Sequence, residues 1–539
     1  MSTTYPIWTT SWRCPTAGNL AIGVVERLVT QHDDGTYSYG DRLVIHKDPI
    51  RPFWITYPQF QTYEYKKEFE DIAKCQKYEC KESELLEKIT MALGYHYTRY
   101  RTLRQACSNP FVYGADIDIE TIIRQQYRDK ETPGIPLTFT RGGLDIENEL
   151  TGQKRINVLT FIHEHTVYTA ALKECCRIHL GDDKFQDATT EDVVAKIHDM
   201  LGYYFTEHKF TLEFKMCDTE VELIAWIFSK IHANKTNFIG IWNIEYDIPY
   251  ILDRLAVNNV RAEDIMCHPE VPHQYKYVNF KKDTSDVGHI TDKWHWTVIS
   301  GYSQFIDSMC LYGRLRKVKG RDSSYNLDDI ATKELGHGKL HFGNITNHIY
   351  EQKYHFLEYI AYNINDVLIM QLMEFKTNDL ISLHALTGLS PLNYFSRQTA
   401  MLRNDAYHYG LSIGKLPSSS GDNMTTEYDK QQVKAGGTVL PPNKAIGTRT
   451  SVVKEYDRET LVSLFSNDLD AASMYPTVTS AFNISKETAK STVIRIHGYP
   501  QEAVESYFSG IVNPDVSAIS LCTTFLGLPG YTEIEKILT

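Results

Sequence analysis

Residues 237–247 read Asn-Phe-Ile-Gly-Ile-Trp-Asn-Ile-Glu-Tyr-Asp, an apolar run that ends in carboxylates. The first part, residues 237–242, predicts a short strand, and residues 249–255 predict the first turns of a helix. Asp247 lies just beyond the strand. Because ligand sites form at strand ends in sheets that are flanked by helices, Asp247 is a candidate functional residue.

The segments around this strand predict the rest of a sheet. Residues 112–120 alternate and are rich in apolar residues, which indicates a buried strand, and residues 155–163 and 209–216 indicate two more. Apolar residues recur at helical spacing in 219–232 and 350–372. This order of elements favours a mixed α/β (α+β) fold in which helices cover a sheet.

The length and composition fit a soluble protein with more than one domain. At 539 residues the chain is too long for one hydrophobic core, and we expect three or four domains. We find no apolar run of about 18 residues and therefore expect no membrane span. No secretory signal is evident at the N-terminus. The ten cysteines show no metal-binding pattern, so reduced thiols in the cytoplasm are expected.

The acidic balance bears on possible partners. The formal net charge is −12 and the pI is near 5.9, which alone argues against a protein coated with nucleic acid. The argument is weak for a large chain, because DNA responds to a local basic surface and because metal-binding carboxylates add negative charge. Nucleic acid binding is therefore not excluded.

Two pairs of polar residues share a face of a predicted element. Asp118 and Glu120 are two apart on the predicted strand, so both side chains would leave the same side. Tyr362 and Asp366 are four apart on the predicted helix, so they share one helical face. By spacing alone, Asp116 with Asp118 is an alternative to Asp118 with Glu120.

Carboxylates on otherwise apolar elements need compensation, because burying a charge without a partner is costly. Two divalent cations, Mg²⁺ or Mn²⁺, would supply it, since hard cations choose oxygen ligands. A cation pair can activate a water and stabilise the leaving oxygen in phosphodiester cleavage. We expect the Tyr362 hydroxyl to position that water and four carboxylates to hold the cations: Asp118, Glu120, Asp247 and Asp366.

Three motifs resemble those of DEDD-type exonucleases, and Tyr362 is typical of the tyrosine subgroup. The matching stretches are Ala-Asp-Ile-Asp-Ile-Glu-Thr at 115–121, Trp-Asn-Ile-Glu-Tyr-Asp at 242–247 and Tyr-Asn-Ile-Asn-Asp at 362–366. This alignment favours Asp118 with Glu120 as the first pair. A fourth stretch, Asp-Ala-Ala-Ser-Met-Tyr-Pro at 470–476, resembles motif A of family B DNA polymerases. The likeness is greatest to the replicative polymerases of tailed bacteriophages.

The resemblance implies a ribonuclease H-like exonuclease and the beginning of a polymerase palm. It implies that Asp470 binds the metals of the polymerase site, that Ala472 and Ser473 contact the triphosphate, and that Tyr475 lies beneath the incoming sugar. The implied organisation is an N-terminal domain at 1–110, an exonuclease at 111–375, a connecting segment at 376–425 and the start of the palm at 426–539.

The motifs that follow motif A in the family, a lysine-containing helix and the palm sequence Asp-Thr-Asp, are not found up to Thr539. The resemblance therefore implies that this chain does not polymerise alone, and we favour a split polymerase over a truncated product. The implied partners are a single-stranded DNA 3′ end or a primer-template, a second subunit that completes the palm, a deoxynucleoside triphosphate with that subunit, and as a candidate a sliding clamp.

Two other functions remain open from the sequence. One is a stand-alone 3′–5′ exonuclease of DNA repair or RNA processing, which the exonuclease motifs alone would also fit. The other is a non-catalytic DNA-binding scaffold that has kept the fold. The motif at 470–476 counts against the first, and the intact carboxylates count against the second.

Overall fold

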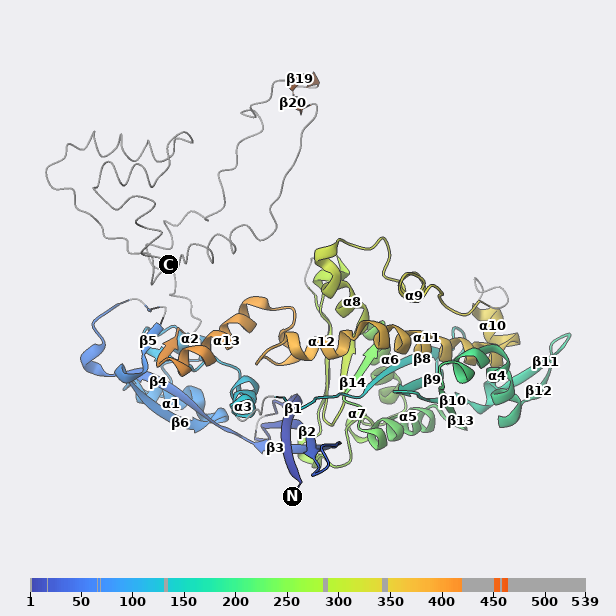
Figure 1. Ribbon diagram of the computed structural model, residues 1–539, viewed down its shortest axis with the longest axis horizontal. Coiled ribbons are helices and arrows are strands. Elements are labelled where there is room, and N and C mark those ends of the chain that lie inside the picture. Colours follow the sequence, from blue (N-terminus) through green and yellow to red (C-terminus); the bar gives the residue numbers. More distant parts are fainter. Residues whose placement is uncertain are drawn as a thin grey trace. The chain divides into compact units, whose positions relative to one another are not determined.

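The computed structural model describes residues 2–418, apart from 17, 65, 68, 130–133, 285–288 and 342–347, and the backbone of 450–455 and 458–463. Contacts divide the chain into two units, Met1–Gln432 and Val433–Thr539. In the second unit the described elements are the paired strands β19 (Thr450–Glu455) and β20 (Arg458–Ser463). The elements that follow belong to the first unit (Figure 1).

An eight-stranded sheet dominates the first unit, with the order β13-β10-β9-β8-β14-β17-β16-β15. Strand β8 pairs antiparallel with β9 and parallel with β14, so the sheet is mixed. The strands are β8 (Arg141–Asn148), β9 (Ile156–His163), β10 (Thr166–Leu172), β13 (Thr211–Cys217), β14 (Phe238–Ile241), β15 (Val278–Lys281), β16 (Trp296–Ile299) and β17 (Gln304–Asp307).

Helices cover both faces of this sheet, because successive strand residues point to opposite sides and both sides are apolar. On one face α4 (Thr190–Thr206), α9 (Leu327–Leu335) and α11 (Phe356–Thr377) pack against Val158 and Ile162. On the other face α5 (Glu220–Asn234) and α6 (Ile244–Val257) pack against Leu144 and Ile146. Figure 1 shows α11 and α5 on opposite sides of β8, β9 and β10.

Further elements join or flank the sheet. A small antiparallel pair of strands, β11 (Arg177–Gly181) and β12 (Lys184–Asp187), precedes α4. The helices are α7 (Ala262–Met266), α8 (Ser308–Arg316), α10 (His348–Tyr354), α12 (Asp379–Leu386) and α13 (Gln398–Ser412).

The N-terminal residues form smaller sheets. Strands β1 (Thr3–Cys14), β2 (Ala21–Gln31) and β3 (Tyr37–Lys47) form an antiparallel sheet. A second sheet has the order β6-β4-β7, and β5 pairs with β18. The elements concerned are β4 (Ile50–Thr56), β5 (Phe69–Asp71), β6 (Cys75–Lys81), β7 (Val112–Tyr113), β18 (Lys415–Pro417), α1 (Leu85–Ala92), α2 (Leu103–Cys107) and α3 (Ile119–Arg128).

The mixed α/β architecture predicted from the sequence is confirmed, and the helix predicted at 219–232 and the strands predicted at 155–163 and 209–216 are present with shifted ends. The predicted strand at 112–120 is wrong beyond Tyr113. There Asp118 caps α3, because its Oδ1 accepts a hydrogen bond from the Glu120 backbone N–H at 3.0 Å. Aspartate is a favoured N-cap residue for this reason.

Two further expectations concern the whole chain. None of the described helices combines the length and the apolar character that a membrane span requires. The domain boundaries at 110/111, 375/376 and 425/426 stay predictions.

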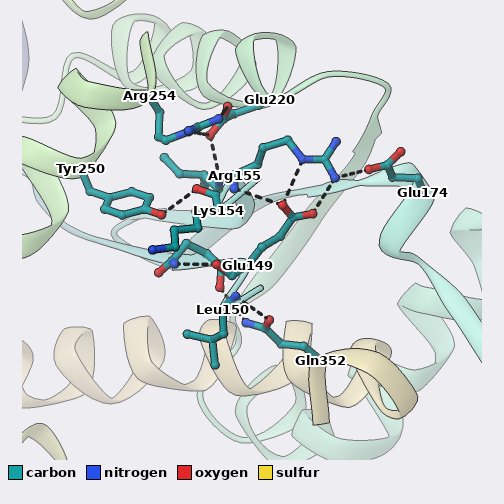
Figure 2. A network of polar contacts seen from close by, with 11 residues as sticks. Glu149, Leu150, Lys154, Arg155, Glu174, Glu220, Tyr250, Arg254 and Gln352 are labelled. Carbon is teal, nitrogen blue, oxygen red and sulfur yellow. Dashed lines mark hydrogen bonds and ion pairs between the residues drawn. The ribbon is translucent and has the colours of Figure 1, made fainter. Parts of the chain in front are cut away.

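A buried ion pair joins both helices of the α5–α6 face to the sheet (Figure 2). Arg254 on α6 donates to both oxygens of Glu220 at 2.8 and 2.9 Å. The backbone N–H of Ile156, the first residue of β9, donates to the same carboxylate at 2.7 Å. Glu220 is 4% exposed and Arg254 9%, so the contact is shielded from solvent.

Replacing Arg254 with alanine should lower the free energy of unfolding by about 3–5 kcal/mol, because a buried carboxylate would lose its partner. Chemical denaturation followed by tryptophan fluorescence measures this change. The matched control is Arg261→Ala, whose side chain is 59% exposed next to Glu263, and which should cost less than about 1 kcal/mol. Equal losses in the two variants would contradict the account.

Candidate functional site

Strand β8 carries two carboxylates on one face. Asp145 and Glu147 are two apart, so both leave the side of the strand that faces α11. The residues between and before them, Leu144 and Ile146, point into the opposite core. Gly142 is the second residue of this strand, and no side chain fits there, since a Cβ would lie 2.2 Å from the carbonyl oxygen of Ile162.

The end of β8 is fixed by the turn that follows it, as Figure 2 shows. Glu149 accepts hydrogen bonds from the backbone and the guanidinium group of Arg155, each at 3.1 Å. Gln352 on α10 donates to the Asn148 carbonyl at 2.7 Å and accepts from the Leu150 N–H at 3.2 Å. These contacts hold the acidic strand in register with the helical layer.

The Tyr250 hydroxyl on α6 donates to the Lys154 carbonyl at 2.6 Å, which ties the same turn to the helix that carries Asp247 (Figure 2). Asp247 lies in the first turn of α6, just after β14. It is 3% exposed, and no described group bonds to its Oδ2. The predicted position of Asp247 at a strand end is therefore what the structure shows.

Helix α11 contributes the polar residues on the other side. Tyr362 and Asp366 share one helical face, as their spacing predicts, and both are buried. The same helix supports the strand carboxylates: Asn363 Nδ2 donates to Asp145 Oδ2 at 2.6 Å, and the Tyr359 hydroxyl donates to Glu147 Oε2 at 2.5 Å. Helix and strand thus orient each other's acidic groups.

A lysine from the segment after α9 reaches into this acidic group. Lys339 Nζ donates to Asp366 Oδ2 at 2.5 Å and to the Tyr362 hydroxyl oxygen at 3.0 Å. The neighbouring carboxylates raise the pKa of Lys339, although its burial acts in the opposite direction. Lys339 is therefore charged at neutral pH and compensates one of the carboxylates.

Asp145, Glu147, Lys339 and Asp366 line one cavity of about 700 Å³, and Tyr362 is joined to it through its hydrogen bond with Lys339. One oxygen from each of Asp145, Glu147 and Asp366 lies within 4.8 Å of the others. Asp247 lines the same cavity. The structure thus brings together Asp247, Tyr362 and Asp366 from the sequence prediction.

The electrostatics of the cavity follow from its crowding. Burial, with the charge of Asp247 as the next cause, raises the pKa of Asp145 well above its usual range. Burial and nearby Glu147 do the same for Asp247. Burial raises the pKa of Glu147 to about 7 and that of Asp366 to about 6, with Lys339 opposing the second shift.

The donor set fits divalent cations. All the candidate ligands are carboxylate oxygens, which Mg²⁺ and Mn²⁺ prefer. Two of these oxygens, Asp247 Oδ2 and Asp366 Oδ1, are buried without a hydrogen-bond partner among the described residues. Lys339 is one positive charge among four carboxylates, so a cation would supply the missing compensation. Asp145, Glu147, Asp247 and Asp366 would hold it.

The structure places Asp118 and Glu120 elsewhere, which corrects the expectation that they share one site with Asp247 and Asp366. Both line a second cavity, together with Ser11 and Trp296. Ser11 Oγ donates to Glu120 Oε1 at 2.7 Å, and the Tyr394 hydroxyl donates to Asp118 Oδ2 at 3.2 Å. The pair is not on a strand, and its position is set by the N-terminal turn of α3.

Sequence reasoning missed Asp145, Glu147 and Lys339. The stretch Leu-Asp-Ile-Glu at 144–147 has the alternation of a half-buried strand and the same acidic spacing as Asp118 and Glu120. That signal was available. Lys339 had no such signal, because no regular element or motif surrounds it. The predicted palm residues, Asp470, Ala472, Ser473 and Tyr475, lie outside the described residues.

The pKa shifts predict how stability depends on pH without divalent ions. The pKa of Glu147 is about 7 in the folded chain, against an ordinary value of 4.5. Between these values the folded chain keeps a proton that the unfolded chain has lost, so the free energy of unfolding should fall as pH rises. Melting temperatures in EDTA, measured from about pH 5 to about pH 7.5, test this slope.

Manganese should recover stability at the upper pH, because a ligand that binds only the folded state stabilises it. A Glu147→Gln variant should show a shallower slope than the native chain. A melting temperature that rises with pH in EDTA would contradict the assignment of these carboxylates. So would a melting temperature at the upper pH that is the same with and without manganese.

No curated protein matches the chain. Residues 173–330 match the family model described as DNA polymerase family B, exonuclease domain. The matched segment includes Asp247, whereas Asp145, Glu147 and Asp366 lie outside it. This segment is thus similar to the exonuclease domain of family B DNA polymerases, which supports a 3′–5′ exonuclease that acts on DNA.

Proposed function

We propose that the chain removes nucleotides from DNA 3′ ends with two divalent cations held by Asp145, Glu147, Asp247 and Asp366. The observation that carries this proposal is the convergence of these four carboxylates from β8, α6 and α11 on one cavity. The family match at 173–330 supports the same chemistry. When bound, the cations supply a nucleophile from water and stabilise the leaving oxygen.

The protein's own residues would orient the reaction. Lys339 donates to the oxygen of the Tyr362 hydroxyl, so the hydroxyl proton is directed away from Lys339. The tyrosine can then donate that proton to a water or a phosphate oxygen and fix its position. Lys339 also places a positive charge beside the acidic cluster, where negative charge would build up on a transferring phosphate.

The groups behind the carboxylates would keep their geometry constant. Asn363 holds Asp145, and Tyr359 holds Glu147. Supporting contacts of this kind fix the orientation of metal ligands and strengthen metal binding. The proposal thus assigns to Asp145 and Glu147 the role that the sequence assigned to Asp118 and Glu120.

We extend the proposal to the wider protein on the resemblance of its motifs. The exonuclease would have a ribonuclease H-like fold and would proofread for a family B polymerase of a tailed bacteriophage. Residues 426–539 would begin the palm, with Asp470 as a metal ligand, Ala472 and Ser473 at the triphosphate, and Tyr475 beneath the sugar. A second chain that carries the lysine-containing helix and Asp-Thr-Asp is the proposed polymerisation partner.

The first test compares the two acidic pairs. Asp145→Ala should lower kcat for digestion of a single-stranded 3′ end by several orders of magnitude, because a ligand that acts in the transition state is lost. Asp118→Ala should keep kcat within about twofold, since only interactions made in the transition state change it. Release of mononucleotides from a 5′-labelled oligonucleotide in Mg²⁺ measures both.

The reverse pattern would overturn the assignment: an Asp145→Ala variant with the native kcat and an Asp118→Ala variant that folds but is inactive. Asp366→Ala tests the same site with a carboxylate that comes from α11 and not from β8. If all three variants digest DNA at the native rate, the chain is not this kind of nuclease.

The second test concerns the lysine. Lys339→Ala should lower kcat by about 10²-fold, comparable to the loss of one oriented donor at a developing negative charge. The control is Lys333→Ala on α9, a half-exposed lysine that pairs with Asp322. A Lys339→Ala variant that retains at least half of the native kcat would show that Lys339 has no role in the reaction.

A further inference from the structure

A second group of metal-ligating side chains lies where β16 and β17 meet the start of α8. His295 immediately precedes β16, Asp307 ends β17, and Cys310 lies in the first turn of α8. One ligand atom from each of the three lies within 4.8 Å of the others. All three residues are buried, with exposed fractions of 1%, 1% and 0%. The proposed nuclease chemistry uses none of them.

Two polar atoms of this group have no hydrogen-bond partner in the described part of the chain, His295 Nε2 and Asp307 Oδ2. Buried polar atoms in folded proteins almost always have a partner, so the pair needs an explanation. The other oxygen of Asp307, Oδ1, accepts a hydrogen bond from the Cys310 N–H at 2.8 Å, which fixes the carboxylate. A cation between Nε2 and Oδ2 would satisfy both atoms at once.

Glu245, in the first turn of α6, lies at the edge of the same group. Its Oε2 is 3.1 Å from His295 Nε2, although the two do not form a hydrogen bond of normal geometry. Lys282 pairs with the other oxygen, Oε1. Glu245 is therefore placed to supply a fourth ligand atom beside the three buried ones.

The kinds of ligand indicate which metal fits. Thiolate and imidazole ligands suit Zn²⁺, whereas Mg²⁺ prefers oxygen atoms alone. In a tetrahedral zinc site the ligand atoms lie about 3–4 Å apart, so small inward shifts from the observed spacing would be enough. The Cys310 thiolate and the Asp307 carboxylate would also balance the two charges of the ion, which allows the site to be buried.

The tautomer of His295 sets a further requirement. Its Nδ1 accepts a hydrogen bond from the Asp283 N–H at 3.1 Å, whereas a metal on Nε2 requires the proton on Nδ1. Burial lowers the pKa of His295, and the charges of Glu245 and Asp283 oppose that shift, so the Asp283 carboxylate is close to the ring. It is a suitable new acceptor for the Nδ1–H, because carboxylates commonly orient histidines that bind metals.

We propose that His295, Asp307 and Cys310 bind a structural zinc ion, with Glu245 as the fourth ligand. The ion would join β16, β17, α8 and the start of α6. Asp307 pairs with Ile241 at the end of β14, so the ion would also support the strand end that precedes the nuclease carboxylate of α6. The cysteines show no metal-binding spacing in the sequence, because the ligands come from separate elements.

Titration of the full chain with Co²⁺, which can replace zinc in such sites, tests this proposal. A thiolate ligand gives cobalt a near-ultraviolet charge-transfer band that oxygen ligands do not give, so cobalt on the nuclease carboxylates does not contribute to it. We expect the band to saturate at a single cobalt per chain and to disappear when zinc is added.

Two substitutions in the site should have different effects. Cys310→Ser should abolish the band and weaken zinc about 100-fold or more, because the loss even of a supporting contact typically costs 10–100-fold. Asp307→Asn should weaken zinc but keep the band at higher cobalt concentrations, because the thiolate remains.

The matched control is Cys175→Ser. Cys175 lies in another cluster with Glu149 and Glu174, where Arg155 already pairs with both carboxylates, so the band should persist in this variant. It should also persist in Asp145→Ala, which separates the zinc site from the nuclease site.

A native chain without the near-ultraviolet band at saturating cobalt would overturn the proposal. So would a band that Cys175→Ser removes and Cys310→Ser keeps. If Cys310→Ser does not fold, the native titration and Asp307→Asn decide alone, and native zinc affinity in Asp307→Asn would contradict the proposed ligand set.

Discussion

The constraint on which this structure depends is the concentration of negative charge in one cavity. Asp145, Glu147, Asp247 and Asp366 line the same cavity, the first two half-buried and the last two buried, and Lys339 neutralises one of them. Carboxylates so placed either keep protons or bind cations, and the raised pKa values of Asp145 and Glu147 show the first tendency. Such a cluster lowers stability unless its charge is compensated, and the proposed cation site supplies that compensation.

The fold holds this charge by dividing it between elements that are rigid for other reasons. Strand β8 lies between β9 and β14, inside the eight-stranded sheet. Helix α11 packs its apolar residues on one face of that sheet, and the buried Glu220–Arg254 pair secures the helices on the other. The carboxylates therefore cannot move apart to relieve their repulsion, which is the condition for a preorganised cation site.

Part of this site could be read from the sequence and part could not. Asp247, Tyr362 and Asp366 were predicted because β14 and α11 have strong local patterns. The pair Asp118 and Glu120 was wrongly placed on a strand, since an aspartate before a helix resembles an aspartate on a strand until its capping bond is seen. Asp145 and Glu147 were missed although residues 144–147 alternate as a strand does; Gly142 just before them is unusual in a strand, and the need for that glycine arises from its partner β9. Lys339 could not be predicted from the sequence, because only the tertiary fold brings it to the carboxylates.

Anomalous diffraction from crystals soaked in Mn²⁺ tests the central claim most directly, because it locates the cations without reference to activity. The account predicts manganese peaks bounded by the carboxylates of Asp145, Glu147, Asp247 and Asp366, with Lys339 displaced from Asp366 or retained beside it. Peaks next to Asp118 and Glu120, with none at the β8 and α11 carboxylates, would contradict it.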